Sequence, residues 1–209
     1  MTTDSSPPRC DNASVGVIIT GPAGFLMFDR ATFPAGTAPV AGHVFDAHDG
    51  YTDAAAAEVE EELGLSVTSL ELVTGGWRAN RCRRTPGPRG IGHHWQVFVA
   101  EVAGTLSPSP RETRNARWLH INQVQDLATR TADYAAGRLP ATEYRCAGGM
   151  EPVWLRWFCD LGGIRVRPDD LTAVDALAAH PHLIPGATSA ALLAHTDLDR
   201  QEGLRPCDP

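Results

Sequence analysis

The chain has 209 residues, of which 43% are apolar and 21% are charged, and its formal net charge at pH 7 is −7. This length suits one domain with extensions, and the composition is that of a globular protein rather than a disordered one. The negative charge argues against general binding to nucleic acids or acidic membranes. All 18 basic residues are arginine, which excludes a lysine-based mechanism.

Residues 1–13 are polar and contain prolines, so we expect a flexible N-terminal tail. Two short apolar runs, at 15–19 and 25–28, flank a Gly/Pro turn and predict a β-hairpin. Apolar patterns further along the chain predict strands at 67–73, 95–102 and 116–119, and helices at 124–138 and 150–161. Strands on both sides of a central helix, followed by terminal helices, favour a mixed sheet between helices.

These elements place one domain over residues 14–162. The remaining residues, 163–209, are a C-terminal extension whose role the sequence does not indicate. It contains two weak helical patches, at 169–179 and 188–194, among several prolines. Nothing in the chain approaches the roughly 20 consecutive apolar residues of a membrane span.

The most unusual segment is a helix predicted between an N-cap at Thr52 and a C-terminal glycine at Gly64. Its expected core face is made by four apolar residues, Ala55, Ala56, Val59 and Leu63. The helix also carries four glutamates within five residues, of which Glu58, Glu61 and Glu62 share a face and Glu60 points to solvent.

Like charges at i,i+4 spacing destabilise a helix, and this acidic face lacks basic partners. A divalent cation would offset the repulsion, because hard cations prefer oxygen ligands. An acidic, solvated face is the ordinary alternative.

Residues 42–65 resemble the Nudix box, G-x5-E-x7-R-E-U-x-E-E-x-G-U, in which U is a bulky aliphatic residue. The motif's helix glutamates fall on Glu58, Glu61 and Glu62, and its aliphatic positions on Val59 and Leu65. Three positions depart from the motif: Ala57 replaces the usual arginine, Asp49 replaces the upstream glutamate, and Gly42 lies one residue early for the opening glycine.

This resemblance implies an α/β/α sandwich with a mixed β-sheet. It also implies metal-dependent hydrolysis of a nucleoside diphosphate linked to another group, such as an NTP or an NDP-sugar, by attack of water on phosphorus. Glu58, Glu61 and Glu62, with the carbonyl of Gly42, would hold Mg²⁺ or Mn²⁺, and Glu61 or Glu112 would accept the proton of the water. Glu112 is placed like an acidic residue that relatives supply from the loop before the last core strand, with Glu101 as the alternative.

Two other functions stay open at this stage. A Nudix-like domain can sense a nucleotide and regulate without hydrolysis. An isomerase of the isopentenyl-diphosphate type resembles the same box but needs a catalytic cysteine, for which Cys82 is the candidate.

Five arginines and a tryptophan occupy the Pro/Gly-rich segment 75–92. Guanidinium groups bind phosphate oxygens in pairs of hydrogen bonds, so this segment is predicted to hold the diphosphate while the tryptophan stacks on a base. Arginines paired with local carboxylates and a tryptophan at a core edge are the alternatives. The predicted substrate-binding residues are Trp77, Arg78, Arg81, Arg83 and Arg84, with Arg89 beside them.

The five cysteines are scattered and none forms a C-x-x-C pair, so the sequence supports neither a zinc knuckle nor a disulfide framework. A reducing, cytoplasmic location follows from this, and a homodimer is possible. His43 and His48 flank the loop that carries Asp49, where each can either ligate a metal or make ordinary hydrogen bonds. His93 and His94 open a strand, so their side chains are expected on opposite faces.

Overall fold

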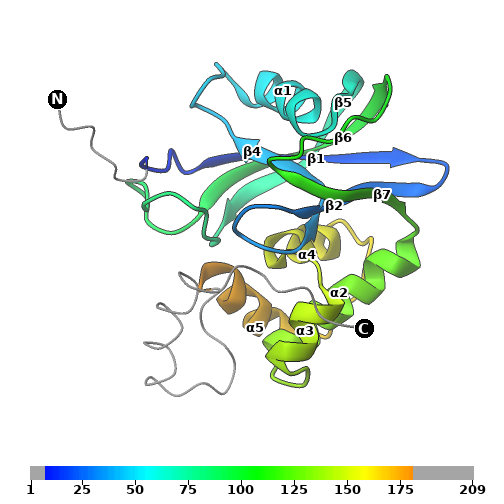
Figure 1. Cartoon of the computed structure of the whole chain (residues 1–209). Coiled ribbons are helices and arrows are strands. Elements are labelled where there is room, and N and C mark those ends of the chain that lie inside the picture. Colours follow the sequence, from blue (N-terminus) through cyan, green and yellow to red (C-terminus); the bar gives the residue numbers. More distant parts are fainter. Residues whose placement is uncertain (1–7, 181–209) are drawn as a thin grey trace.

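A seven-stranded mixed β-sheet with helices on both faces makes up residues 8–180, which are the part of the chain that the computed structural model describes (Figure 1). Strand β1 pairs in parallel with β6 and antiparallel with β2 and β4, and β5 closes one edge against β6. The predicted sandwich with a mixed sheet is therefore confirmed. The strands are β1 (Ala13–Gly21), β2 (Gly24–Arg30), β3 (Thr37–Ala38), β4 (Val40–His43), β5 (Ser66–Arg78), β6 (His93–Ala103) and β7 (Thr113–Leu119).

Five helices cover the two faces of this sheet. One face carries α1, and the opposite face carries α2, α4 and α5 (Figure 1). The helices are α1 (Tyr51–Leu63), α2 (Ile121–Ala135), α3 (Ala141–Ala147), α4 (Pro152–Asp160) and α5 (Pro168–Ala179). None of these helices is both long and apolar enough to cross a membrane.

Strand β1 is central because both of its faces are buried. Val15, Val17 and Ile19 belong to the core beneath α1, whereas Ile18 belongs to the core that contains α2 and α4. Gly16 is required on the second face, because a Cβ there would come within 2.6 Å of the Trp154 ring. The sheet therefore separates two apolar layers, and α1 alone covers the layer that carries the glutamates.

Helix α1 begins at Tyr51, with Gly50 as its N-cap, so the prediction that Thr52 caps it was wrong. Its end was predicted correctly: Gly64 has a φ of 67° and donates its N–H to the carbonyl of Glu60. Ala54 rather than Ala56 lies in the core, because the buried face also includes the row one turn apart that Ala54 shares with Glu58 and Glu62.

Several predicted boundaries shift in the structure. The hairpin and the strand at 95–102 are confirmed, whereas β5 runs on to Arg78 and α2 ends at Ala135. Strands β3 and β4 and helix α3 were missed, since they are short and lie among Gly and Pro residues. The patch at 188–194 lies outside the described residues.

The two ends of the described chain pack against the domain. Residues 9 and 85 form a β-bridge, and Cys10 is buried, so the described part of the expected flexible tail is ordered. At the other end, Val174 and Leu177 of α5 are buried in the core shared with α2 and α4. The first part of the predicted extension thus belongs to the folded unit.

Candidate active site

Three carboxylates converge at the C-terminal half of α1. Carboxylate oxygens of Glu58, Glu62 and Glu112 all lie within 4.8 Å of one another. Glu58 and Glu62 are one helical turn apart, so they project from the same face of α1. An all-oxygen set of this kind suits a hard divalent cation such as Mg²⁺ or Mn²⁺.

Glu112 reaches this cluster because its loop is attached to the end of α1. The N–H groups of Ser107 and Ser109 donate to the carbonyls of Leu63 and Glu62, at 2.8 and 2.9 Å. These bonds satisfy carbonyls that a helix end leaves without partners. They also fix the loop between β6 and β7, which places Glu112 beside the helix. Glu101, the alternative considered from sequence, is exposed on β6 and lies outside the cluster.

Gly42 lies directly against this cluster. A Cβ at this position would overlap the Glu58 carboxylate, so any other residue would displace that side chain from its present position. The neighbouring Ala41 donates its N–H to Glu62 Oε2 at 3.3 Å. Strand β4 therefore brings a backbone N–H to the carboxylates, and the role of the Gly42 carbonyl stays a prediction.

The carboxylates repel one another in a partly dry environment. The pKa of Glu58 is raised to about 7, chiefly by burial and then by the charges of Glu61 and Glu112, against smaller opposing effects of Arg30 and Arg83. Glu62 is only 4% exposed, and its burial raises its pKa well above the usual value. A bound cation would relieve both the repulsion and the burial, so the residues present fit a divalent metal.

The other two glutamates of α1 are exposed. Glu61 lies outside the set of three, although its charge acts on Glu58. Glu60 points to solvent, as predicted. Of the four glutamates, Glu58 and Glu62 thus belong to the cluster, Glu61 lies beside it, and Glu60 takes no part in it.

The arginine-rich segment does not act as one group in the structure. Arg78 pairs with Asp160 of α4 and lies 4.4 Å above the Trp157 ring, which places it on the face opposite α1. The backbone N–H of Arg81 donates to the carbonyl of Ala178 in α5.

The remaining arginines of the segment are spread out as well. Arg84 pairs with Asp46, and Arg89 lies 4.8 Å above the Trp77 ring. Arg83 is exposed, and its charge lowers the pKa of Glu58. Arg83 is therefore the member of this group whose charge acts on the carboxylate cluster.

Trp77 lies on the face of the sheet that α1 covers. It is paired with His94 across β5 and β6, and the His94 ring contacts Tyr51 of α1. The side chain is 38% exposed, which leaves part of the indole free to contact a ligand. His93 contacts Cys10 and Asn80 instead, so the two histidines do face opposite sides.

Arg30 was missed by the sequence analysis. It ends β2, and its charge lowers the pKa of both Glu58 and Glu62, while its Nε lies 3.5 Å from a Glu151 oxygen. No local pattern marks it, because its position beside the carboxylates depends on how β2 and α1 pack.

The chain belongs to the NUDIX domain family, since the model of that domain matches residues 11–139. It is accordingly a Nudix-type phosphoanhydride hydrolase. No curated protein matches the sequence.

Several solved structures are similar to this chain. A NUDIX hydrolase from Nitrosomonas europaea is 17% identical, with a TM-score of 0.47 over 76% of this chain and 93% of that one. A MutT NUDIX hydrolase from Burkholderia pseudomallei is 18% identical, with a TM-score of 0.46 over 56% and 86%. An Ap4A hydrolase from C. elegans is 20% identical, with a TM-score of 0.42 over 71% and 96%.

Proposed function

We propose that this chain hydrolyses a nucleoside diphosphate linked to another group, with Mg²⁺ or Mn²⁺ held by Glu58, Glu62 and Glu112. The observation that carries the proposal is the convergence of these three carboxylates, one of them buried, beside a glycine that leaves them room. When bound, the cation supplies neutralisation of the diphosphate charge and acidification of a water molecule.

The protein's own residues would position the reactants and move the proton. The oxygen of water attacks a phosphorus, the anhydride P–O bond breaks, and the leaving phosphate keeps the electron pair. Glu61 is the favoured acceptor of the proton, because it lies beside the cluster without belonging to it, and Glu112 is the alternative. Gly42 contributes its carbonyl to the cation site.

Arg83 and Trp77 are the proposed substrate contacts. The exposed guanidinium of Arg83 suits a phosphate oxygen near Glu58, and Trp77 presents an aromatic surface on the same side of the sheet. Arg84 is a weaker candidate, because Asp46 already binds it. Arg78 and Arg81 contact α4 and α5, so we assign them to the fold rather than to the substrate.

Cys82 does not support an isomerase. An isomerase would need its catalytic cysteine beside the carboxylates. Cys82 instead belongs to a separate group with Cys10, His43 and His93. A cytoplasmic location and a homodimer stay predictions.

The proposal is tested by incubating the purified chain with NTPs, NDP-sugars and dinucleoside polyphosphates, and identifying the products by chromatography. We expect release of a nucleoside monophosphate or diphosphate with Mg²⁺ or Mn²⁺, and none in excess EDTA. Glu62→Gln should abolish the same products. Turnover that persists in EDTA, or a folded chain that binds Mg²⁺ but cleaves no member of the panel, would contradict the proposal.

A further inference from the structure

A second group of metal-binding side chains lies apart from the carboxylates. It joins Cys10, which precedes β1, His43 at the end of β4, Cys82 in the β5–β6 loop, and His93 at the start of β6. One ligand atom from each of these residues lies within 4.8 Å of the other three. Cys10 and Cys82 are free thiols.

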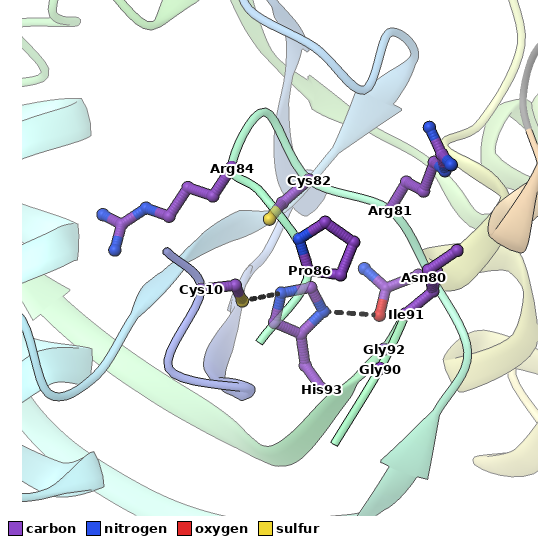
Figure 2. A pocket seen from close by; sticks show the side chains of 10 residues that line it. All are labelled: Cys10, Asn80, Arg81, Cys82, Arg84, Pro86, Gly90, Ile91, Gly92 and His93. Carbon is purple, nitrogen blue, oxygen red and sulfur yellow. Dashed lines mark hydrogen bonds between the residues drawn. The ribbon is translucent and has the colours of Figure 1, made fainter. Parts of the chain in front are cut away.

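Two of the ligand–ligand distances are close to those of a tetrahedral zinc site, one within the expected range and one about 0.2 Å below it. Zn–S bonds of about 2.3 Å and Zn–N bonds of about 2.0 Å place neighbouring ligand atoms roughly 3.3–3.8 Å apart. Here Cys10 Sγ lies 3.1 Å from His93 Nε2 and 3.5 Å from His43 Nε2. Figure 2 shows the sulfur atoms of Cys10 and Cys82 and the His93 ring turned toward one another, while the guanidinium groups of Arg81 and Arg84 point away.

Asn80 fixes the orientation and protonation of His93. Its Oδ1 lies 3.2 Å from Trp95 Nε1, which can only donate a hydrogen bond, so this atom of Asn80 is an acceptor. The same oxygen lies 2.9 Å from His93 Nδ1, which must then carry the hydrogen. The lone pair of the neutral ring is thereby left on Nε2, the atom that faces Cys10. Metal-binding histidines are held in this way by an acceptor on their other nitrogen.

The surroundings also suit a metal–thiolate group. The backbone N–H of Asn12 donates to Cys10 Sγ at 3.3 Å, which stabilises negative charge on the sulfur. The adjoining cavity has a volume of about 40 Å³. Sites for small organic ligands usually measure roughly 300–1,000 Å³, so an ion fits here and a nucleotide does not.

We propose that Cys10, His43, Cys82 and His93 bind one structural Zn²⁺ ion. Two thiolates balance the charge of the ion, which limits the cost of burying it. Four protein ligands leave no open position for a substrate, so the metal is structural rather than catalytic. This proposal does not depend on the hydrolase activity, and it goes beyond the sequence, in which the cysteine spacing supports no zinc knuckle.

The ion would connect segments that the substrate site needs. Cys82 lies between Arg81 and Arg83, and His43 follows Gly42, which contacts Glu58. The N-terminal segment already joins the same loop, since Cys10 donates its N–H to the Thr85 carbonyl at 2.9 Å. Zinc would therefore hold the arginine-rich loop and the end of β4 in fixed positions on the sheet.

The first test uses the full-length wild-type chain, purified without chelators or a metal-binding tag. We expect elemental analysis to find about one zinc per chain after dialysis. After replacement of zinc by Co²⁺, the absorption spectrum should show a sulfur-to-cobalt charge-transfer band and the intense visible bands of tetrahedral cobalt. A cobalt-loaded chain without the sulfur-to-cobalt band would overturn the proposal, whatever the behaviour of any variant.

Variants test which residues hold the ion. Cys82→Ser should remove bound zinc, whereas the matched control Cys159→Ser, at a half-buried free thiol of α4, should retain it. Asn80→Ala keeps all four ligands and should weaken zinc binding about 10–100-fold. Glu62→Gln should leave the zinc content unchanged, so loss of hydrolysis and loss of zinc are separable. Unchanged zinc content in Cys82→Ser would mean that the ion is bound elsewhere.

Discussion

The carboxylate cluster and the cysteine–histidine cluster differ in both their chemistry and their place in the sequence. The first offers only oxygen atoms, two of its three residues come from one helix turn, and part of it is open to solvent. The second offers sulfur and nitrogen from four separate segments between residues 10 and 93. Oxygen sites suit exchangeable Mg²⁺, and sulfur–nitrogen sites retain Zn²⁺. The comparison predicts that Mg²⁺ at the carboxylates takes part in turnover, whereas Zn²⁺ at the cysteines and histidines stabilises the fold.

The sharpest test of the carboxylate cluster is Glu62→Gln, which we expect to lower kcat at least ~100-fold, the scale of losing transition-state electrostatics. Glu58→Gln should do the same, and Glu61→Gln should also lower kcat strongly, because Glu61 is the favoured acceptor of the proton. The matched control is Glu60→Gln, which is exposed on the same helix and should stay near wild type. Steady-state kinetics with Mg²⁺ would check this, and equal losses at all four positions would refute the division of the helix.

Gly42→Ala should lower activity roughly 10–100-fold, because the added Cβ overlaps the Glu58 carboxylate and displaces it. Gly50→Ala is the matched control: it is extended, with a φ of −167°, and an added Cβ meets no atom within 4 Å. Mg²⁺ titration and kinetics on both variants would show whether β4 shapes the carboxylate site. A Gly42→Ala variant as active as Gly50→Ala would contradict the packing.

The pH dependence of Mg²⁺ binding should report the protonation of Glu58 in the carboxylate cluster. Since the pKa of Glu58 is raised to about 7, chiefly by burial, a proton competes with the metal below this pH, and Mg²⁺ affinity should fall roughly fivefold between pH 7 and pH 6. Without metal, the raised pKa acts on stability in the opposite direction, because stability falls rather than rises as pH increases. Glu58 favours the folded state below its usual pKa of 4.5, and this contribution is lost as pH rises toward 7 and beyond.

Calorimetry of Mg²⁺ binding and thermal unfolding of metal-free protein, each across pH 4–8, would measure both effects. The Glu58→Gln variant should lose the part of this dependence that Glu58 contributes and keep the part that comes from the buried Glu62. A wild-type Mg²⁺ affinity that is constant across the range would mean that Glu58 is already ionised at low pH.

The smallest expected effects are those of replacing Arg83 and Arg78, which lie in the same segment but should affect different properties, KM and stability. Arg83→Ala should raise KM several-fold with little change in Tm, because the side chain is exposed and its charge acts on the carboxylate site. Arg78→Ala should leave KM unchanged and destabilise the fold by about 1 kcal/mol, since it loses the Asp160 pair and its place above Trp157. The reverse pattern would restore Arg78 to the substrate site.

Sequence predicted the local features of this molecule better than those that depend on packing. Helix α1, its end at Gly64 and the grouping of Glu58 with Glu62 follow from periodicity and from a glycine that adopts a positive φ. Glu112 was placed by resemblance, and the structure brings it to the helix. These positions share a local pattern or a fixed spacing, which a sequence displays directly.

The parts that sequence did not predict are produced by tertiary contacts. The cysteines and histidines of the second cluster have no spacing that marks them, because four segments meet only after β1, β4, β5 and β6 pair. In the sequence, Trp77 and the arginines of segment 75–92 look like one substrate-binding group. Neighbouring residues of a strand face opposite sides of the sheet, however, so Trp77 points toward the α1 layer and Arg78 toward the α4 layer. Arg30 likewise acquires its position from the packing of β2.

Two hydrogen bonds, from the N–H groups of Ser107 and Ser109 to the end of α1, order the loop that carries Glu112 before any substrate binds. A free loop would have to lose its conformational entropy each time a substrate arrives, which weakens binding. Here that entropy is lost once, during folding, and Glu112 is in place beforehand. Insertions or deletions within residues 105–111 should therefore slow catalysis. Insertions or deletions of the same length elsewhere, which keep the Ser107 and Ser109 N–H groups bonded to the helix, should slow it less.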